Sequence, residues 1–503
     1  MQLSYVHGEI LETAGCAMIQ AVYQEGDQIR LTAGTLACDA KIGGLIQGLI
    51  EAGEITGKLN ETTVLYPSGL PIGKLVIVGL GKIEEFTMDR LRQVSGTAVK
   101  IAAKGKVEKI ISALHGVVEG KLCPCKGAQA VAEGTILALT RSDLLQAKPG
   151  TTSLKEVVVV ESCQDCFKES YPWFNKGIAM AEGTRLARQL TTLPANYMTP
   201  THMSDEAAKI ASATGLKLDV LEKDDMLRLG MGCLLGVAQG SAQPPKMIIL
   251  RHDGDPEHPE DILALVGKGL TFDAGGISLK PGAGMEAMKG DMGGGAAVLG
   301  AMQVVGTLKP RRNVIGVVAA TENLPDGNAF KPGDVLTGMT GKTIEIISTD
   351  AEGRLILADA VAYAEKLGAS RIIDAATLTG SSAQAFGGIF ATILANCDSF
   401  YSDVISAAEL SGERFWRMPI VDEYKEMYKS PVADIKNSGA RGGGMITGGL
   451  IIAEFISKAA WVHLDIAGMT HYADDRPYMP KGYNGFATRT MAELALLGWQ
   501  PDN

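Results

Sequence analysis

Short apolar runs alternate with helix-like stretches along most of this 503-residue chain, and this alternation constrains the fold more than any other feature. Apolar runs bounded by glycine or polar residues are typical of buried strands, and the stretches between them are long enough for crossover helices. The pattern therefore predicts the α/β fold class. The expected strands are residues 74–78, 109–114, 156–160, 262–266, 313–319, 343–347, 371–374 and 461–464.

The chain is too long for one domain of ~100–200 residues, so we expect two. A charged helical pattern from residue 167 to residue 193 ends at Pro194 and Pro200, which break helices. We interpret it as a helix that links a smaller N-terminal α/β domain to a larger C-terminal α/β domain with a mixed central sheet flanked by helices. The expected bounds are residues 1–165, 166–193 and 194–503.

Two further helices have clear signals. Residues 88–103 follow the strand at 74–78, and the stretch after Arg354 places apolar side chains on one stripe, with Gly368 as a suitable C-terminal cap. Between the first strand and helix, Gly79-Leu80-Gly81 resembles the start of a dinucleotide-binding fingerprint, but Glu84 stands where the third glycine belongs. We expect a structural turn there rather than a cofactor site.

Cysteine usage and charge limit the compartment and the partners. The eight cysteines are scattered; among them Cys123, Cys125, Cys163 and Cys166 imitate a zinc site, but the C-x-C spacing of the first pair favours free thiols. No signal peptide and no apolar stretch of ~18 residues is visible, so we expect a cytoplasmic protein with no membrane partner. A net charge of −10 argues against general nucleic-acid binding, although a local basic patch stays open.

Acidic residues of the second half concentrate in three glycine-rich segments. The first, G-K-G-L-T-F-D-A-G-G-I-S-L-K-P, contains Lys268, Asp273 and Lys280; the second, M-K-G-D-M-G-G-G, contains Asp291; the third, S-T-D-A-E-G-R-L, contains Asp350, Glu352 and Arg354. Ligands of open α/β sheets bind at strand ends, so we expect the segments to meet in one cleft. If the third segment is extended, its charged residues, two apart, face the same side.

Four carboxylates in one cleft repel each other unless cations hold them, and two divalent ions would balance their charge. Carboxylate oxygens suit manganese, magnesium or zinc, and the helical H-E-x-x-H zinc motif is absent. The pKa of a lysine beside two cations should fall, so that its neutral amine ligates a metal, while a second, charged lysine stabilises an oxyanion. Two alternatives stay open: ordinary turns with solvated ion pairs, and a phosphate-cradling loop, although G-x-x-x-x-G-K-[ST] is absent.

Read in order, these segments closely resemble the leucine (cytosol) aminopeptidase family of two-metal peptidases. The third segment is similar to the family signature N-T-D-A-E-G-R-L, with Ser348 in place of the usual Asn, at a position that holds no metal. The resemblance extends through L-T-T-L-P-A-N-Y-M-T-P, D-A-A-T-L-T-G and H-L-D-I-A-G. It covers the second domain and the linking helix, whereas the first domain is similar only in general layout.

The resemblance implies two divalent ions per subunit, manganese or zinc. Asp273 and Glu352 would bridge both ions, Lys268 and Asp291 would complete the readily exchanged site, and Asp350 would serve the other through its carboxylate and carbonyl. Lys280 and Arg354 resemble the catalytic pair, with a bicarbonate on Arg354 as general base. The residues similar to those of the substrate pocket are Met288, Thr377, Leu378, Gly380 and Ala467; core packing explains a methionine equally well.

The resemblance further implies the substrate, the assembly and the rival functions. One metal would bind the free amine of a peptide, so that N-terminal residues, leucine and other apolar ones, are released; the subunits would form a homohexamer. Some bacterial members of the family also bind DNA, so an enzyme with an additional DNA-binding regulatory role is the alternative function. A catalytically silent scaffold and a metal-dependent phosphohydrolase are the other rivals.

Overall fold

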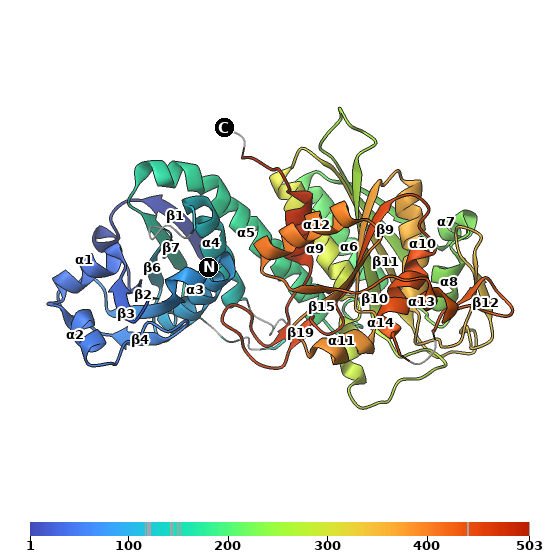
Figure 1. The fold of residues 1–503 in the computed structure, drawn as a ribbon, viewed down its shortest axis with the longest axis horizontal. Helices are drawn as coiled ribbons and strands as arrows, with labels where there is room; N and C mark the ends of the chain where they lie inside the picture. Colours follow the sequence, from blue (N-terminus) through green and yellow to red (C-terminus); the bar gives the residue numbers. More distant parts are fainter. Residues whose placement is uncertain are drawn as a thin grey trace. The chain divides into compact units, whose positions relative to one another are not determined.

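The computed structural model describes residues 1–501 except 116, 118–121, 141–142, 144, 148–149, 151 and 440–441. The chain divides into two compact units. The first contains Met1–Glu182 and the short segment Asp474–Lys481, and the second contains Gly183–Ala473 and Gly482–Trp499. The long helix α5 (Gln164–Thr192) contains the point at which the chain passes from one unit to the other (Figure 1). The predicted domain bounds stay a prediction.

The first unit is built on a seven-stranded sheet in the order β1-β7-β6-β2-β5-β4, with β3 beside β2. Three of its strands are the apolar runs expected from the sequence, now β5, β6 and β7. Helices α3 and α4 pack against each other, while α1 and α2 contribute Cys38 and Ile46 to an apolar cluster with Met18 and Leu75 of the sheet. The elements are β1 (Gln2–His7), β2 (Ala17–Glu25), β3 (Gln28–Leu31), β4 (Thr62–Leu65), β5 (Lys74–Lys82), β6 (Lys109–Ala113), β7 (Glu156–Glu161), α1 (Ala33–Lys41), α2 (Leu45–Glu51), α3 (Met88–Ala102) and α4 (Pro124–Ala138).

The expected turn at Gly79-Leu80-Gly81 is wrong, because these residues continue strand β5. Gly79 pairs with Val22, and the register shifts before Lys82, so the glycines form a bulge in the strand. A Cβ on Gly79 would lie 2.1 Å from the carbonyl oxygen of Lys58, and Gly81 has φ +75°. The glycines are therefore required by a close backbone crossing and a left-handed conformation.

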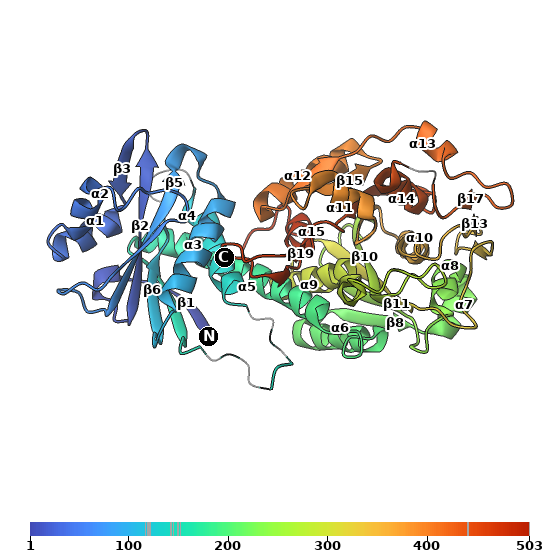
Figure 2. The same cartoon turned by 90° about the horizontal axis from the view of Figure 1, so that it is seen from below.

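The second unit contains an eight-stranded mixed sheet in the order β16-β15-β18-β14-β10-β11-β9-β8. The four central strands, β18, β14, β10 and β11, are parallel to one another. On either side of them, β15 pairs antiparallel with β18, and β9 pairs antiparallel with β11. Helices α6 and α9 lie on one side of β10 and β11, and α8 and α10 lie on the other (Figures 1 and 2). The strands are β8 (Lys217–Leu221), β9 (Lys246–Asp253), β10 (Ile262–Asp273), β11 (Asn313–Asn323), β14 (Arg371–Ala376), β15 (Ala391–Ala395), β16 (Phe415–Arg417) and β18 (Ala460–Asp465).

The remaining elements of the second unit surround this sheet. The helices are α6 (Pro200–Thr214), α7 (Lys223–Leu229), α8 (Gly232–Ala238), α9 (Gly293–Leu308), α10 (Gly353–Lys366), α11 (Gly380–Phe386), α12 (Asp398–Ser411), α13 (Glu423–Glu426), α14 (Gly444–Ala453) and α15 (Thr488–Ala495). Two small sheets contain β12 (Val335–Thr337), β13 (Thr343–Glu345) and β17 (Ile435–Lys436), and β19 (His471–Tyr472) and β20 (Gly482–Tyr483). None of the helices that the structure describes is long and apolar enough to cross a membrane.

Helix α10 follows the predicted apolar stripe and ends before Gly368, which has φ +96° as a C-terminal glycine should. Residues Gly353 to Ala364 are all buried, because α8 and α14 cover the side that faces away from the sheet. The segment before it differs from the prediction. Strand β13 belongs to the small three-stranded sheet rather than the central one, and Arg354 lies in the first turn of α10, so Asp350, Glu352 and Arg354 do not share an extended segment.

The parallel strands β10, β14 and β18 are neighbours, so their carboxyl ends lie at one edge of the sheet. Helix α9 approaches this edge very closely: a Cβ on Gly294 would lie 1.9 Å from the carbonyl oxygen of Ala375. Only glycine permits such contact, which explains why residue 294, at the start of this helix, is glycine. The edge brings together loops that are far apart in sequence.

Candidate metal centre

A cavity of about 650 Å³ lies at the carboxyl ends of β10, β14 and β18. Every site residue predicted from the sequence lines this cavity. Those expected to hold metal or to act in catalysis are Lys268, Asp273, Lys280, Asp291, Asp350, Glu352 and Arg354, and those expected to contact substrate are Met288, Thr377, Leu378, Gly380 and Ala467. The geometry brings the residues together; it does not by itself assign their roles.

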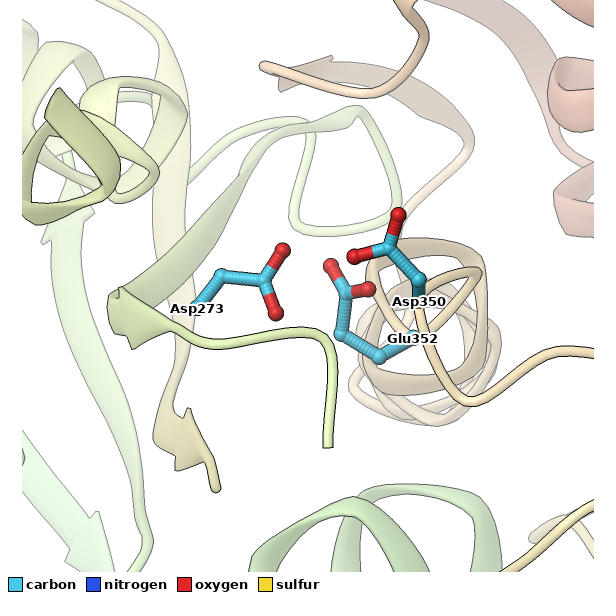
Figure 3. A group of neighbouring side chains, drawn as sticks. All are labelled: Asp273, Asp350 and Glu352. Atoms are coloured by element: carbon cyan, nitrogen blue, oxygen red, sulfur yellow. The ribbon is translucent and has the colours of Figure 1, made fainter. Parts of the chain in front are cut away.

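Three carboxylates form the centre of the site. Asp273 ends β10, Asp350 precedes α10, and Glu352 is the N-cap residue of α10. One carboxylate oxygen from each lies within 4.8 Å of the others. Figure 3 shows the three side chains pointing toward one another across the gap between β10 and α10. Asp291 follows the short 3-10 helix Met285–Gly290 and joins the cluster through Lys268.

The turn after β10 holds Asp273 and Asp350 side by side. Gly275 has φ +85°, and a Cβ there would lie 2.5 Å from the carbonyl oxygen of Ser278 and 2.9 Å from Oδ1 of Asp350. Thr349 Oγ1 donates to the carbonyl of Gly275 (2.6 Å) and accepts from the amide of Ser278 (2.8 Å). These bonds join the first and third acidic segments of the sequence.

Each of the two lysines lies between two carboxylates. Lys268 Nζ is 2.8 Å from Oδ2 of Asp291 and 2.8 Å from Oε1 of Glu352, and it also donates to the carbonyl of Thr377 (2.9 Å). Its amine fits because residue 353 is glycine: a Cβ there would lie 2.8 Å from Nζ. The lysine therefore uses all three of its N–H donors inside the protein.

Lys280 has the same role on the other side of the cluster. Its Nζ is 2.8 Å from Oδ2 of Asp273 and 2.5 Å from Oδ1 of Asp350. The side chain is 22% exposed, compared with 3% for Lys268. Lys280 therefore faces the open part of the cavity, where a substrate atom can reach it.

Burial and mutual contact shift the pKa values of the charged side chains in this cluster. Burial raises the pKa of Glu352 to about 8 and that of Asp291 to about 6, in both cases because desolvation outweighs the attraction of Lys268. Burial lowers the pKa of Lys268, but the carboxylates of Asp291, Glu352 and Asp273 outweigh it, so the pKa lies above its ordinary value. The fall in pKa expected for a lysine beside two cations concerns the metal-bound site and stays a prediction.

The cluster fits divalent cations. Oε2 of Glu352 is buried and has no hydrogen-bond partner within the part of the chain that the structure describes. A buried carboxylate oxygen without a donor is costly, and a cation beside it would offset that cost. The oxygen-rich ligand set, with one amine, suits manganese, magnesium or zinc.

Arg354 lies beside the carboxylates but is not paired with them. The side chain is buried, its Nη1 donates to the carbonyl of Asn437 (3.0 Å), and its Nε has no partner among the described residues. Burial lowers the pKa of the guanidinium from its ordinary value. A free N–H on a buried guanidinium suits a small anion in the cavity.

The loop after β14 forms the less polar wall of the cavity with Met288, Leu378 and Ala467. Thr377 Oγ1 donates to Oδ1 of Asp291 (2.6 Å), which couples this wall to the carboxylates. Gly380 begins α11 and is exposed at the wall. The small residues leave room for an apolar side chain.

The residue that holds the loop after β14 was not predicted from the sequence. Asp465, at the end of β18, accepts hydrogen bonds from the amides of Leu378 (3.2 Å) and Thr379 (3.3 Å) and from the Thr379 hydroxyl (2.5 Å). The signal was present, since Asp465 is the acid of the quoted H-L-D-I-A-G segment. His471 and Tyr483, whose rings are 5.2 Å apart, also line the cavity, and no motif pointed to them.

Asn323 and Asn437 were also missed. Asn323 Nδ2 donates to Oδ1 of Asp273 (2.9 Å) and to the carbonyl of Thr349 (3.0 Å). Asn437 binds the segment before Glu352 through both atoms of its side-chain amide. Each asparagine lies far in sequence from the groups it contacts, so no local pattern could identify it.

Chemically, the arrangement combines a place for cations, a charged lysine that faces the open cavity, and a buried guanidinium with a free donor. These groups suit a reaction in which a water molecule is activated and an oxyanion forms. The less polar wall beside them suits a substrate side chain.

Comparison with known proteins agrees with this geometry. Residues 185–492 match the sequence profile "Cytosol aminopeptidase family, catalytic domain", and residues 21–149 match "Cytosol aminopeptidase family, N-terminal domain". The chain is 43% identical over 499 residues to a probable cytosol aminopeptidase of Alkaliphilus metalliredigens (strain QYMF), with 98% of this chain and 99% of the relative covered. The corresponding protein of Alkaliphilus oremlandii (strain OhILAs) is 42% identical over 497 residues, with 98% and 99% covered.

Solved structures show the same likeness. A tomato leucine aminopeptidase variant superposes with a TM-score of 0.88 at 31% identity, covering 99% of this chain and 96% of the other. The bottromycin maturation enzyme BotP in complex with Mn superposes with a TM-score of 0.85 at 31% identity, covering 97% of this chain and 100% of the other.

Proposed function

The chain belongs to the cytosol aminopeptidase family and is a metal-dependent aminopeptidase, and we propose that it uses two divalent ions, manganese or zinc, to release leucine and other apolar residues from the amino ends of peptides. The observation that carries this proposal is the carboxylate cluster in the cavity, where Oε2 of Glu352 has no hydrogen-bond partner among the described residues.

The ligands proposed for the two ions rest on the family resemblance, and the convergence of the charged side chains supports them. Asp273 and Glu352, at the centre, would bridge both ions. Lys268 and Asp291 would complete one site, which requires Lys268 to lose a proton when metal enters. Asp350 would serve the other site through its carboxylate and carbonyl. Bound there, the two ions would supply Lewis-acid activation of water and of the scissile carbonyl, and hold the substrate amine.

Two side chains of the cavity act on the reacting groups. Lys280, which now contacts Asp273 and Asp350, would donate an N–H to the oxyanion that forms at the scissile carbonyl. Arg354 keeps one donor on the carbonyl of Asn437, and its Nε, which has no partner in the described part of the chain, would be available to a small anion. Bicarbonate held by this guanidinium would act as the general base.

The walls of the cavity set the substrate. Met288, Leu378 and Ala467 present apolar atoms beside the carboxylates. An apolar first side chain is therefore stabilised by burial, at ~25 cal/mol for each Å² removed from water. Chains related to this one carry the name cytosol aminopeptidase, and we propose a cytoplasmic homohexamer.

The test is a screen of metal-depleted enzyme, resupplied with manganese, zinc or magnesium one at a time. We expect hydrolysis of leucyl amide to return with two ions bound per subunit, counted by elemental analysis. N-acetyl-leucyl amide is the matched control, because it lacks only the free amine and should not be cleaved. Cleavage of both amides at equal rates, or hydrolysis of phosphate esters in place of amides, would refute the proposal.

A further inference from the structure

We propose that Asn437 is a positioning residue for the metal centre: its side chain fixes the backbone that carries Asp350 and Glu352, and its carbonyl fixes the guanidinium of Arg354. This inference rests on the proposed function, since it concerns the same site. Asn437 lies immediately after β17, and its side chain is 0% exposed.

The side-chain amide uses its whole hydrogen-bonding capacity on one segment. Oδ1 accepts from the amides of Ile347 (2.8 Å) and Ser348 (3.3 Å). Nδ2 donates to the carbonyls of Ser348 (2.6 Å) and Ala351 (3.3 Å). The amide therefore contacts the backbone on both sides of Asp350 and up to the residue before Glu352.

The main chain of Asn437 completes the arrangement. Its N–H donates to the carbonyl of Glu345 (2.9 Å), where strand β13 ends. Its carbonyl accepts from Nη1 of Arg354 (3.0 Å). One residue thus holds both the carboxylate-bearing turn and the arginine of the site.

The location explains why an asparagine is needed. Strands β13 and β17 pair in parallel only at Ile344 with Ile435 and Glu345 with Lys436. Beyond this point the backbone of residues 347–351 leaves the sheet, and its polar groups require other partners. The side-chain amide of Asn437 supplies these partners and so replaces a missing strand neighbour.

Asn313 supplies a matched control in the eight-stranded sheet, away from the small sheet that contains β17. It is 4% exposed, its Nδ2 donates to the carbonyls of Asp255 (2.9 Å) and His258 (2.9 Å), and its Oδ1 accepts from the amide of Asp255 (3.0 Å). It begins β11, whereas the cavity lies where the neighbouring parallel strand β10 ends. The two asparagines therefore have the same chemistry and differ in their position relative to the site.

The experiment compares Asn437→Ala, Asn437→Asp and Asn313→Ala in the full chain. Manganese affinity is measured by calorimetry on metal-depleted protein, kcat and KM are measured with leucyl amide, and Tm is measured without metal. We expect Asn437→Ala to weaken manganese binding by ~10–100-fold and to lower kcat more than it raises KM, as loss of residues that orient metal ligands does. Asn437→Asp keeps the shape but loses both donors, and we expect the same loss.

The control separates positioning from stability. Asn313→Ala should lower Tm while leaving manganese affinity and kcat within about twofold of the original enzyme. If Asn437→Ala behaves like Asn313→Ala, or if Asn437→Asp keeps full metal affinity, the positioning role is rejected. An original enzyme that binds no manganese and cleaves no aminoacyl amide would instead reject the proposed function.

Hydrogen exchange tests the proposal independently of any variant. The amides of Ile347 and Ser348 lie outside the strands, and we expect them to be protected in metal-depleted protein because Asn437 accepts from both. Exchange at the rate of free peptide at these two amides would overturn the proposal, even if the substituted proteins do not fold.

Discussion

Lys268 and Glu352 are joined by a buried ion pair, with Nζ of the lysine 2.8 Å from Oε1 of the glutamate, and the second oxygen of that glutamate has no partner among the residues described. One oxygen of the Glu352 carboxylate is thus paired with an ammonium group of the protein, and the other is available to a ligand.

Glu352→Gln should weaken both metal ions together, because one bridging negative charge is removed while the shape is kept. We expect the affinity for manganese at both sites, measured by calorimetry, to fall by more than the ~10–100-fold that loss of an outer-shell partner causes. Glu345→Gln is the control, since Glu345 lies in β13 and does not line the cavity. A Glu352→Gln protein that still binds two full equivalents tightly would reject the bridging assignment.

Lys280→Ala should reduce kcat by ~10²–10³ while the metal content is unchanged, because the oxyanion loses its charged donor. Lys289→Ala is the matched control: Lys289 donates to the carbonyl of Thr192 and does not line the cavity. Elemental analysis and steady-state kinetics measure the two quantities. Metal loss in the Lys280→Ala protein would contradict the role given to Lys280.

Removal of metal by a chelator should abolish activity and lower Tm, because ions that bind only the folded state stabilise it by mass action. At a free ion concentration 100 times the Kd, the stabilisation is ~2.7 kcal/mol. Calorimetric scans with and without chelator measure the shift, and added manganese should restore it. A melting curve that the chelator leaves unchanged would count against cations at the cluster.

The stability of the first unit should fall in mild acid because of His115. Burial lowers the pKa of this imidazole to about 4, while an unfolded histidine titrates near ~6.5. The folded pKa is depressed, so the neutral imidazole contributes stability above pH ~6.5 that is lost as the pH falls toward 4. Between pH 7.5 and 5.0 the loss is ~2 kcal/mol.

The substitution His115→Gln tests this assignment. It removes the titration and keeps a group that can bond the hydroxyl of Ser112, now 3.0 Å from Nε2. The fall in Tm between pH 7.5 and pH 5.0 should therefore be smaller in the substituted protein. Equal falls in both proteins would show that His115 is not the responsible group.

The parts of the fold that were predictable from the sequence are those set by local burial. Strands β10 and β11 are continuous apolar runs with both faces covered, and their pattern does not depend on a particular partner. The acidic site was predictable because its residues follow such strands and occur as a recognisable ordered set. The parallel arrangement of β10, β14 and β18 then brings them together.

The failures concern features set by distant partners. Gly79 continues strand β5 by pairing with Val22, and it must be glycine because residue 58 crosses close to it. Strand β13 lies in a separate small sheet, where it pairs with β17, some 90 residues later. Asn437 holds the acidic turn from the same distance in sequence. No local pattern contains such information, because the contacting residue does not alter the periodicity of the segment it touches.

The two lysines of the cavity separate folding from metal supply. With each ammonium seated between two carboxylates, the acidic groups have internal counter-ions before any metal arrives. A divalent ion can therefore enter or leave this centre while the scaffold around it keeps its own counter-charges.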